Sequence, residues 1–431
     1  MALALSLAAQ RRNVLLLDAR TPSAAPSVAA GFDQRIYAIS PASVAWLTDL
    51  KLWQAVDAAR VVPVYDMQIH GDAPDASRLP WQPALPGAAQ PGAQGMRGLQ
   101  LSAYRAGVGE LCTIVEEREL ARVLTQALRF ASGVEVLRPA GLASLKSGDD
   151  AATLRLNDGR VLGAKLIVAA DGARSWLRGA AGIATDEIDY GHTAVVANFQ
   201  IEKPHVNCAT QWFRQEAGGG SSVLAWLPLP GHQVSMVWSA PDALAAELMA
   251  LPPQALAARV AAAGGHLLGA FKAAGTAASF PLRNQRARSL IAARVALVGD
   301  AAHVVHPLAG QGLNLGLGDC AELARVLGGV DRAAALRTGG TNRRAGPRAA
   351  AGSATSSARV RDPGDALALR RYERARKAAL FEMHVITHGL QRLFSAQQPA
   401  LRTLRNLGLN LAGRLPVIPR WLVQRATRTF Q

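Results

Sequence analysis

The sequence predicts a mixed α/β fold in which an antiparallel β-sheet domain interrupts a domain with parallel strands. Two segments, residues 1–18 and 293–327, each join a short buried strand to a helix. Between them, residues 192–240 contain four long strand patterns separated by glycine and proline turn signals. Because this run of strands stands between two α/β segments, we expect one domain to be inserted into the other.

Composition narrows the class of protein. The chain has 431 residues, of which 50% are hydrophobic, so it is too long for one compact core and too apolar for global disorder. Its three cysteines are scattered and lack C-x-x-C spacing, which predicts a reducing compartment without a disulfide framework or a metal site. Residues 1–9 lack the basic start of a signal peptide. No stretch approaches the ~20 apolar residues that span a bilayer.

The net charge of +16 is concentrated outside the expected domains. Residues 332–361 contain many arginines, no acid and almost no large apolar side chain, so we expect a disordered insertion there. Much of the remaining positive charge follows residue 368. Charge confined to a loop and a tail is not a docking face on a folded domain, and we therefore expect no nucleic-acid partner.

The first residues resemble the second half of a dinucleotide-binding βαβ unit, since a helix at 1–9 precedes a strand at 14–17 that ends in Asp18. We expect the first strand and a GxGxxG loop to be missing ahead of that helix. Further predictions are a helix capped near Ser40, a helix at 115–128, a hairpin turning at 157–159, and a buried strand at 166–169. Helices are also predicted within 241–272 and after 363.

These patterns divide the chain into four predicted parts. The discontinuous Rossmann-like domain comprises residues 1–75, 105–190 and 285–331, and the β-rich domain comprises 76–104 and 191–284. Residues 332–361 form the insertion, and 362–431 form a helical, basic C-terminal part.

The strongest motif spans residues 295–319, where a buried strand delivers Gly299 and Asp300 and a glycine pair at 310 and 312 opens a helix. Gly299 allows close backbone approach, Asp300 can accept hydrogen bonds from ribityl hydroxyls, and the helix start exposes amides. The stretch therefore predicts a flavin nucleotide across the strand ends. The alternative is a buried acid satisfying its own loop, with glycines that serve only as turn residues.

The stretch GDAAHVVHPLAGQGLNLGLGD closely resembles the second FAD motif of aromatic-ring hydroxylases with the para-hydroxybenzoate hydroxylase fold, nearest to those of ubiquinone biosynthesis. Supporting stretches lie at residues 33–47, 166–178, 189–205, 281–287 and 365–378. The resemblance implies FAD, NAD(P)H and O₂, a C4a-hydroperoxyflavin, and a polyprenylated phenol as substrate. A ubiquinone-biosynthesis complex is a further expected partner.

The resemblance also implies roles for individual residues. Asp18 takes the place of the acid that holds the adenosine ribose, and Arg35 that of an arginine at the FAD phosphate and ribityl chain. Asp171 and Gly172 match a motif near the pyrophosphate. The residues expected to line the flavin are Gly299, Asp300, Pro307, Gly310, Gln311, Gly312, Leu313 and Asn314. Two alternatives stay open: Asp18 as a plain acid at a strand end, and Arg35 as a surface cation. Glu117 stands where relatives often carry Asn, Gln or Arg.

Other side chains carry two interpretations each. His303 and His306 shape the pocket or handle a proton, because their spacing without a nearby carboxylate is a poor metal site. Trp226 and Trp238 line a dry pocket or belong to the core. Competing functions are another flavin oxidoreductase, of polyprenyl reductase or halogenase type, and a non-catalytic scaffold.

The C-terminal segment 401–430 places leucines at helical spacing beside arginines. One interpretation is a helix that packs on the protein's own core. The other is docking to a membrane surface, in which arginines attract anionic lipid and apolar side chains enter the headgroup region. We expect a cytoplasmic protein, with docking at the inner face of the plasma membrane as the second interpretation.

Overall fold

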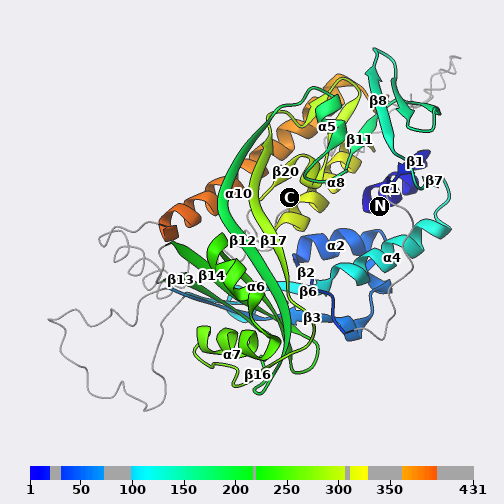
Figure 1. Ribbon diagram of the computed structural model, residues 1–431. Helices are drawn as coiled ribbons and strands as arrows, with labels where there is room; N and C mark the ends of the chain where they lie inside the picture. Colours follow the sequence, from blue (N-terminus) through cyan, green and yellow to red (C-terminus); the bar gives the residue numbers. More distant parts are fainter. Residues whose placement is uncertain (20–30, 72–98, 217–219, 306–310, 329–361, 396–431) are drawn as a thin grey trace, which may run out of the picture.

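The computed structural model describes residues 1–19, 31–71, 99–216, 220–305, 311–328 and 362–395, with side chains described up to residue 381 in the last range. The predicted insertion at 332–361 and the segment 401–430 lie outside these residues, as do His306, Pro307 and Gly310. Figure 1 shows an elongated molecule, in which the long strands β12 (Thr185–Ile201) and β17 (Ala278–Ala287) run side by side from one end toward the other.

The amino-terminal α/β elements form as predicted. Helix α1 (Ala2–Ala9) precedes strand β1 (Val14–Leu17), which pairs in parallel with β7 (Val134–Leu137). Helix α2 (Pro41–Asp49) is capped by Ser40, whose Oγ accepts a hydrogen bond from the Ser43 amide at 3.3 Å. The helix predicted at 115–128 begins later, at α4 (Glu117–Phe130), because Val115 and Glu116 end strand β6 (Cys112–Glu116).

A second parallel pair carries the two acid-glycine turns. Strand β11 (Ile167–Ala169) runs parallel to β19 (Val295–Leu297), and β18 (Ile291–Ala292) pairs antiparallel with β19 on its other side. Among the described residues this sheet and the β1–β7 pair are separate. Because carboxyl ends of parallel strands meet at one edge, the turns after β11 and β19 lie close together.

Two smaller three-stranded sheets complete the α/β part. One has the order β2 (Ile36–Ile39), β6 and β3 (Val61–Val64). The other is an antiparallel meander, in which the predicted hairpin turns at Gly159 with a φ of 90°. Its strands are β8 (Leu142–Ser147), β9 (Ala152–Leu156) and β10 (Val161–Ala164).

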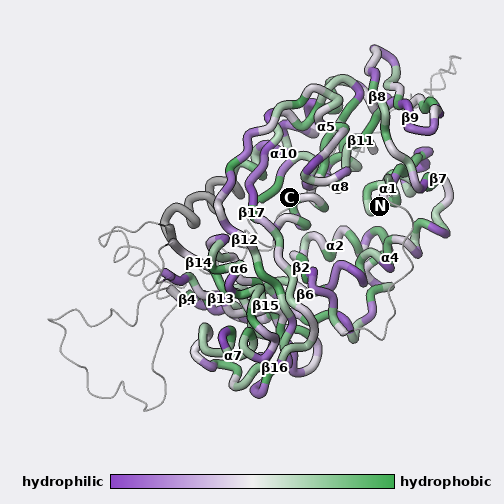
Figure 2. Tube along the Cα trace, in the orientation of Figure 1, coloured by the Kyte–Doolittle hydropathy of each residue, from purple (hydrophilic) through white to green (hydrophobic). Residues whose placement is uncertain are grey.

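The domain predicted to be antiparallel is a nine-stranded sheet among the residues that the structure describes, and it is antiparallel except for one parallel pair of strands. In spatial order its strands are β20 (His303–Val304), β17, β12, β15 (Gln233–Pro241), β14 (Ser221–Leu229), β13 (Cys208–Gln215), β4 (Asp66–His70) and β5 (Leu99–Ser102), with β16 (Phe271–Ala273) beside β12. Helices α6 (Asp242–Ala250) and α7 (Pro253–Ala263) contribute side chains to its core. Figure 2 shows hydrophobic residues along its inner strands.

Sheet membership differs from the predicted domain limits at four places. Strand β17 runs to Ala287, past the predicted limit at 284, and β20 lies within the range predicted for the Rossmann-like domain. Strand β4 belongs to the large sheet because it pairs with β13, although it precedes the predicted limit at residue 75. Strand β12 begins at Thr185, before the limit at 191, because its first residues already pair with β17. The division into domains otherwise stays a prediction.

Two helices cover the strand-end turns. Helix α8 (Gly312–Leu327) approaches the turn after β19 closely, since a Cβ on Gly316 would lie 3.1 Å from the Gly299 Cα. Helix α10 (Ala366–Ser395) lies against α8 and joins the same core through Leu369 and Tyr372. The glycine pair therefore lets α8 pack directly on the turn that carries Asp300.

Candidate flavin site

The turn after β19 presents an acid to solvent beside the start of a helix. Gly299 has a φ of 61°, a left-handed conformation that favours glycine, and Asp300 follows with an exposed side chain. Although exposed, Asp300 loses part of its hydration to surrounding protein atoms, which raises the pKa of its carboxyl, while His303 and Arg35 act to lower it. Asp300 is thus an available acceptor in a partly desolvated setting.

Helix α8 directs free amides toward this turn's side of the molecule. Its N-cap, Gln311, makes no side-chain capping bond, so the first amides after Gly312 have no capping partner among the described side chains. The N-terminus of a 16-residue helix favours a negatively charged group beside it. Gln311, Gly312 and Leu313 are half-buried, and their contact with a flavin stays a prediction.

Asn314 has a structural use that the sequence did not reveal. Its side chain is fully buried, and its Oδ1 accepts hydrogen bonds from the Ser40 amide at 2.9 Å and the Ser43 hydroxyl at 2.8 Å. Its Nδ2 donates to the Ala38 carbonyl at 2.8 Å. The side chain of Asn314 thus fastens α8 to the start of α2, and only its backbone is left to face a flavin.

Asp319 is the buried residue that sequence reasoning missed. Its carboxylate accepts hydrogen bonds from the Gly299 amide at 2.8 Å and from Arg376 Nε at 2.6 Å, and it contacts His303 Nε2 at 2.7 Å. Burial acts to raise the pKa of Asp319, but the neighbouring His303 and Arg376 hold it below its ordinary value. The only sequence signal was its position at the end of the 295–319 motif.

Arg35 lies on the other side of the site and already has an acidic partner. Its Nη1 lies 3.1 Å from Glu117 Oε2, and its guanidinium stacks over the Phe280 ring at 5.0 Å. Tyr37 donates to the same Glu117 oxygen at 3.4 Å. Burial, followed by the charge of Glu117, raises the pKa of Tyr37 to about 12. Both members of the Arg35–Glu117 pair are substantially exposed, so Arg35 can still reach a ligand.

A second buried carboxylate, Glu116, holds the chain that leads to Arg35. Its Oε2 accepts from the Asp33 amide at 2.6 Å and from Arg118 Nη2 at 3.0 Å, and its Oε1 accepts from Arg60 Nε. Asp33 in turn accepts from the Arg35 amide at 3.2 Å. This network, absent from the sequence-based account, fixes the backbone of Arg35 while its side chain stays exposed.

The structure brings Asp171 and Gly172 to the same edge as Gly299 but gives Asp171 a local task. Its carboxylate accepts from the Ser175 hydroxyl at 2.5 Å and the Leu177 amide at 3.1 Å, at the start of α5 (Trp176–Ala180). Gly172 has a φ of 85° and open space around its Cα. The turn is therefore a rigid strand end whose backbone is accessible.

Arg178 links the two turns. It donates to the carbonyls of Ala301 and Ala173, each at 2.9 Å. Asp18 lies apart, on the β1–β7 sheet, where Arg138 Nε stands 3.2 Å from its carboxylate. An adenosine ribose at Asp18 would compete with Arg138 for that carboxylate.

The two tryptophans belong to the core. Trp226 and Trp238 are both almost completely buried, and Trp226 packs edge-on against Trp212 at 4.5 Å. They are not the lining of an open pocket, because the sheet and the helices α6 and α7 enclose them. His303 is also buried.

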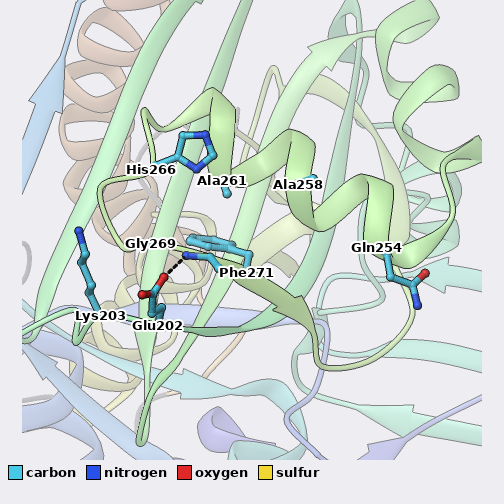
Figure 3. A pocket seen from close by; sticks show the side chains of 9 residues that line it. Glu202, Lys203, Gln254, Ala258, Ala261, His266, Gly269 and Phe271 are labelled. Carbon is cyan, nitrogen blue, oxygen red and sulfur yellow. Dashed lines mark hydrogen bonds between the residues drawn. The ribbon is translucent and has the colours of Figure 1, made fainter.

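A surface hollow of about 510 Å³ lies elsewhere, at α7 and β16. Figure 3 shows Phe271 and His266 beside it, with Glu202 accepting a hydrogen bond from the Ala270 amide at 2.8 Å. Figure 1 places α7 and β16 far from α8, at the other end of the molecule. This hollow is therefore separate from the strand-end turns.

The residues at the strand ends fit part of a flavin nucleotide. They provide an exposed carboxylate at Asp300, free amides at the start of α8, and a cation at Arg35. The closely packed Gly299 and Gly316 leave no side chain between this turn and the helix. Hydrogen-bond donors for a flavin and an acceptor for its ribityl chain are thus present in the part of the chain that the structure describes.

Solved structures share this fold. p-Nitrophenol 4-monooxygenase PnpA from Pseudomonas putida matches with a TM-score of 0.68 and 18% identity, over 100% of this chain and 95% of that protein. PqsL from Pseudomonas aeruginosa, described as a probable FAD-dependent monooxygenase, matches with a TM-score of 0.66 and 20% identity over 95% of each chain. These two likenesses show that the chain has the fold of these proteins.

Sequence relatives extend over nearly the whole chain. Ubiquinone hydroxylase UbiL of Rhodospirillum rubrum is 31% identical over 429 residues, covering 100% of this chain and 87% of the relative. The 3-demethoxyubiquinol 3-hydroxylase of Escherichia coli is 32% identical over 430 residues, covering 99% of this chain and 95% of the relative. Residues 34–351 match the family described as FAD binding domain. The chain belongs to this FAD-binding family of flavin monooxygenases.

Glu117→Gln is expected to tighten FAD binding by about twofold to fivefold. The substitution removes a carboxylate that repels the diphosphate and competes for Arg35. The size follows from exposed ion pairs, which are worth about 0.2–1 kcal/mol. The effect should shrink at high salt. Fluorescence titration of FAD measures the dissociation constant. In the same variant the pKa of Tyr37 should fall below about 12 but stay above its ordinary value, since burial is the larger cause.

The matched control is Asp158→Asn, which makes the same charge change at a solvent-exposed ion pair with Arg160 in the β9–β10 turn. This control should leave both FAD binding and the Tyr37 titration unchanged. Weaker FAD binding in Glu117→Gln would show that Glu117 orients Arg35 for the cofactor instead of competing with it.

Proposed function

We propose that this protein is an FAD-dependent monooxygenase that hydroxylates the aromatic ring of a polyprenylated phenol in ubiquinone biosynthesis. The observation that carries the proposal is the similarity, over 99% or more of the chain, to two enzymes named as hydroxylases of ubiquinone or its precursor. The strand-end site supports it, because Asp300 offers an exposed acceptor and the start of α8 has no side-chain cap. NAD(P)H and O₂ are the proposed co-substrates.

The overall reaction balances as ring C–H, O₂, NAD(P)H and one proton giving ring C–OH, water and NAD(P)⁺. FAD supplies the chemistry when bound: it takes electrons from NAD(P)H and activates O₂ for transfer of one oxygen atom. The protein's residues bind and orient. Asp300 would accept hydrogen bonds from the ribityl hydroxyls, and the amides at the start of α8 would favour negative charge on the ring system.

The fold also joins the Asp300 turn to the large sheet. Strand β20 follows this turn directly and extends the large sheet, where His303 pairs in register with Arg286 of β17. Exclusion of water at this junction would favour oxygen transfer to the ring over release of peroxide. We propose that the phenol binds at this junction.

Incubation with NAD(P)H, ¹⁸O₂ and a polyprenylated phenol is expected to yield product with one ¹⁸O atom on the ring, measured by mass spectrometry. Asp300→Asn should lower both FAD occupancy and product, because the flavin site loses a charged acceptor. Asp158→Asn should leave both unchanged, because that acid lies on a surface turn.

Other products would contradict the proposal. A saturated prenyl chain would identify a reductase, and a halogenated ring would identify a halogenase. A protein without FAD and without turnover would favour the scaffold interpretation.

We also propose that residues 401–430 bring the enzyme to the membrane surface, where a polyprenylated substrate resides, and where a biosynthetic complex would assemble. The support is the sequence pattern of leucines beside Arg402, Arg405 and Arg414. No helix in the described part of the chain is long and apolar enough to cross a membrane. Peripheral docking requires only charge and shallow apolar insertion.

Replacing Arg402, Arg405 and Arg414 together by glutamine should weaken binding to anionic vesicles by about a hundredfold, since each arginine near the surface is worth about 1 kcal/mol. Vesicle flotation of the full-length protein measures this. The control replaces Arg343, Arg344 and Arg348, which lie in the predicted insertion, and should float like the wild type. Equal flotation of both triple variants would refute the docking proposal.

A further inference from the structure

The buried carboxylate of Asp319 joins four elements at one point. It belongs to α8 and contacts the Gly299 amide after β19, the His303 imidazole of β20 and the Arg376 guanidinium of α10. Asp319 is completely buried, and His303 and Arg376 are nearly so. The turn after β19, strand β20 of the large sheet and helix α10 therefore meet at the side chain of Asp319.

The geometry fixes which His303 nitrogen donates. An ionised carboxylate only accepts hydrogen bonds, so Nε2 of His303, 2.7 Å from Asp319 Oδ2, carries the proton that points toward it. In a neutral imidazole, Nδ1 then carries no proton and can only accept a hydrogen bond. Nδ1 is buried and has no hydrogen-bond partner among the residues that the structure describes. Asp319 thus sets both the orientation and the tautomer of His303.

Arg376 places a permanent positive charge beside Asp319. Its Nε donates to Asp319 Oδ1 at 2.6 Å, and its Nη2 donates to the Leu315 carbonyl at 3.2 Å. Tyr372, one turn earlier on α10, donates to the Leu297 carbonyl at 2.7 Å, immediately before the flavin turn. Helix α10 is therefore bonded to the strand and the helix that form the site.

We propose that Asp319 and Arg376 are positioning residues of the flavin site, through which α10 sets the Gly299–Asp300 turn and the His303 ring. The inference rests on the flavin site proposed above. Burial of an ion pair by itself adds little stability, since apolar residues of similar size often replace such pairs without loss. The use of a carboxylate here is explained by its two other bonds, to an amide and to an imidazole, which an apolar side chain cannot make.

The test compares three variants with one control. Asp319→Asn removes the charge and one of the acceptor oxygens, and Arg376→Met removes the counter-charge. The double variant Asp319→Leu/Arg376→Met replaces the ion pair by apolar groups. It provides a variant without a lone buried charge, which folds even where the single variants do not. The control, Glu373→Gln, lies on the same helix and bonds to Ser289 and the Leu290 amide, away from the flavin turn.

Three measurements separate positioning from stability: the FAD dissociation constant, the visible circular dichroism of bound flavin, and the melting temperature. We expect about tenfold or weaker FAD binding and an altered flavin spectrum in all three variants, because buried donors lose their acceptor or its orientation. The double variant should melt at a higher temperature than either single variant, because no buried charge is left without its counter-charge, but it should not recover the FAD affinity. Glu373→Gln should bind FAD with the wild-type constant and spectrum.

Recovery of both FAD affinity and spectrum in the double variant would overturn the inference and leave the network a purely structural role. Hydrogen exchange of residues 298–305 without FAD keeps this result distinct from failure of the flavin site. If the wild type does not bind FAD, the proposed function fails. Faster exchange of residues 298–305 in Asp319→Asn, but not in Glu373→Gln, would still show that Asp319 positions the turn. Unchanged exchange in Asp319→Asn overturns it.

Discussion

The arrangement of the site depends on one buried carboxylate, Asp319, which must find donors for both oxygens because an ionised group without them is too costly to bury. The donors come from three directions: the Gly299 amide, His303 and Arg376. Satisfying Asp319 therefore fixes the strand-end turn, the last strand of the large sheet and the C-terminal helix relative to α8. The exposed Asp300 follows from this constraint, because its neighbour Gly299 is held from within.

A second buried carboxylate, Glu116, fixes the backbone that leads to Arg35. Glu116 holds the backbone before Arg35 through the Asp33 amide, with Arg60 and Arg118 balancing its charge. Between these two anchors, the side chains that face solvent are Asp300 and the Arg35–Glu117 pair. Buried carboxylates thus hold the backbone from which the exposed charged side chains extend toward a cofactor.

Local patterns predicted most elements but few of the long-range partners. The helix cap at Ser40, the hairpin at Gly159 and the strand before Gly299 follow from short-range periodicity and turn chemistry, and the structure confirms them. The pairing of Asp18 with Arg138 and of Asp319 with Arg376 joins residues 120 and 57 positions apart, which no local pattern encodes. Asn314 shows the same limit: its contact with a flavin stays a prediction, and its bonds to Ser40 and Ser43 depend on tertiary packing.

A crystal structure of this protein grown with FAD tests the central claim most directly. The account predicts isoalloxazine density against Gly299 and the first turn of α8, ribityl hydroxyls within hydrogen-bond distance of the Asp300 carboxylate, and Asp319 still bonded to the Gly299 amide. Density for the flavin at another place, such as the hollow beside α7, or a Gly299 amide released from Asp319 would contradict it.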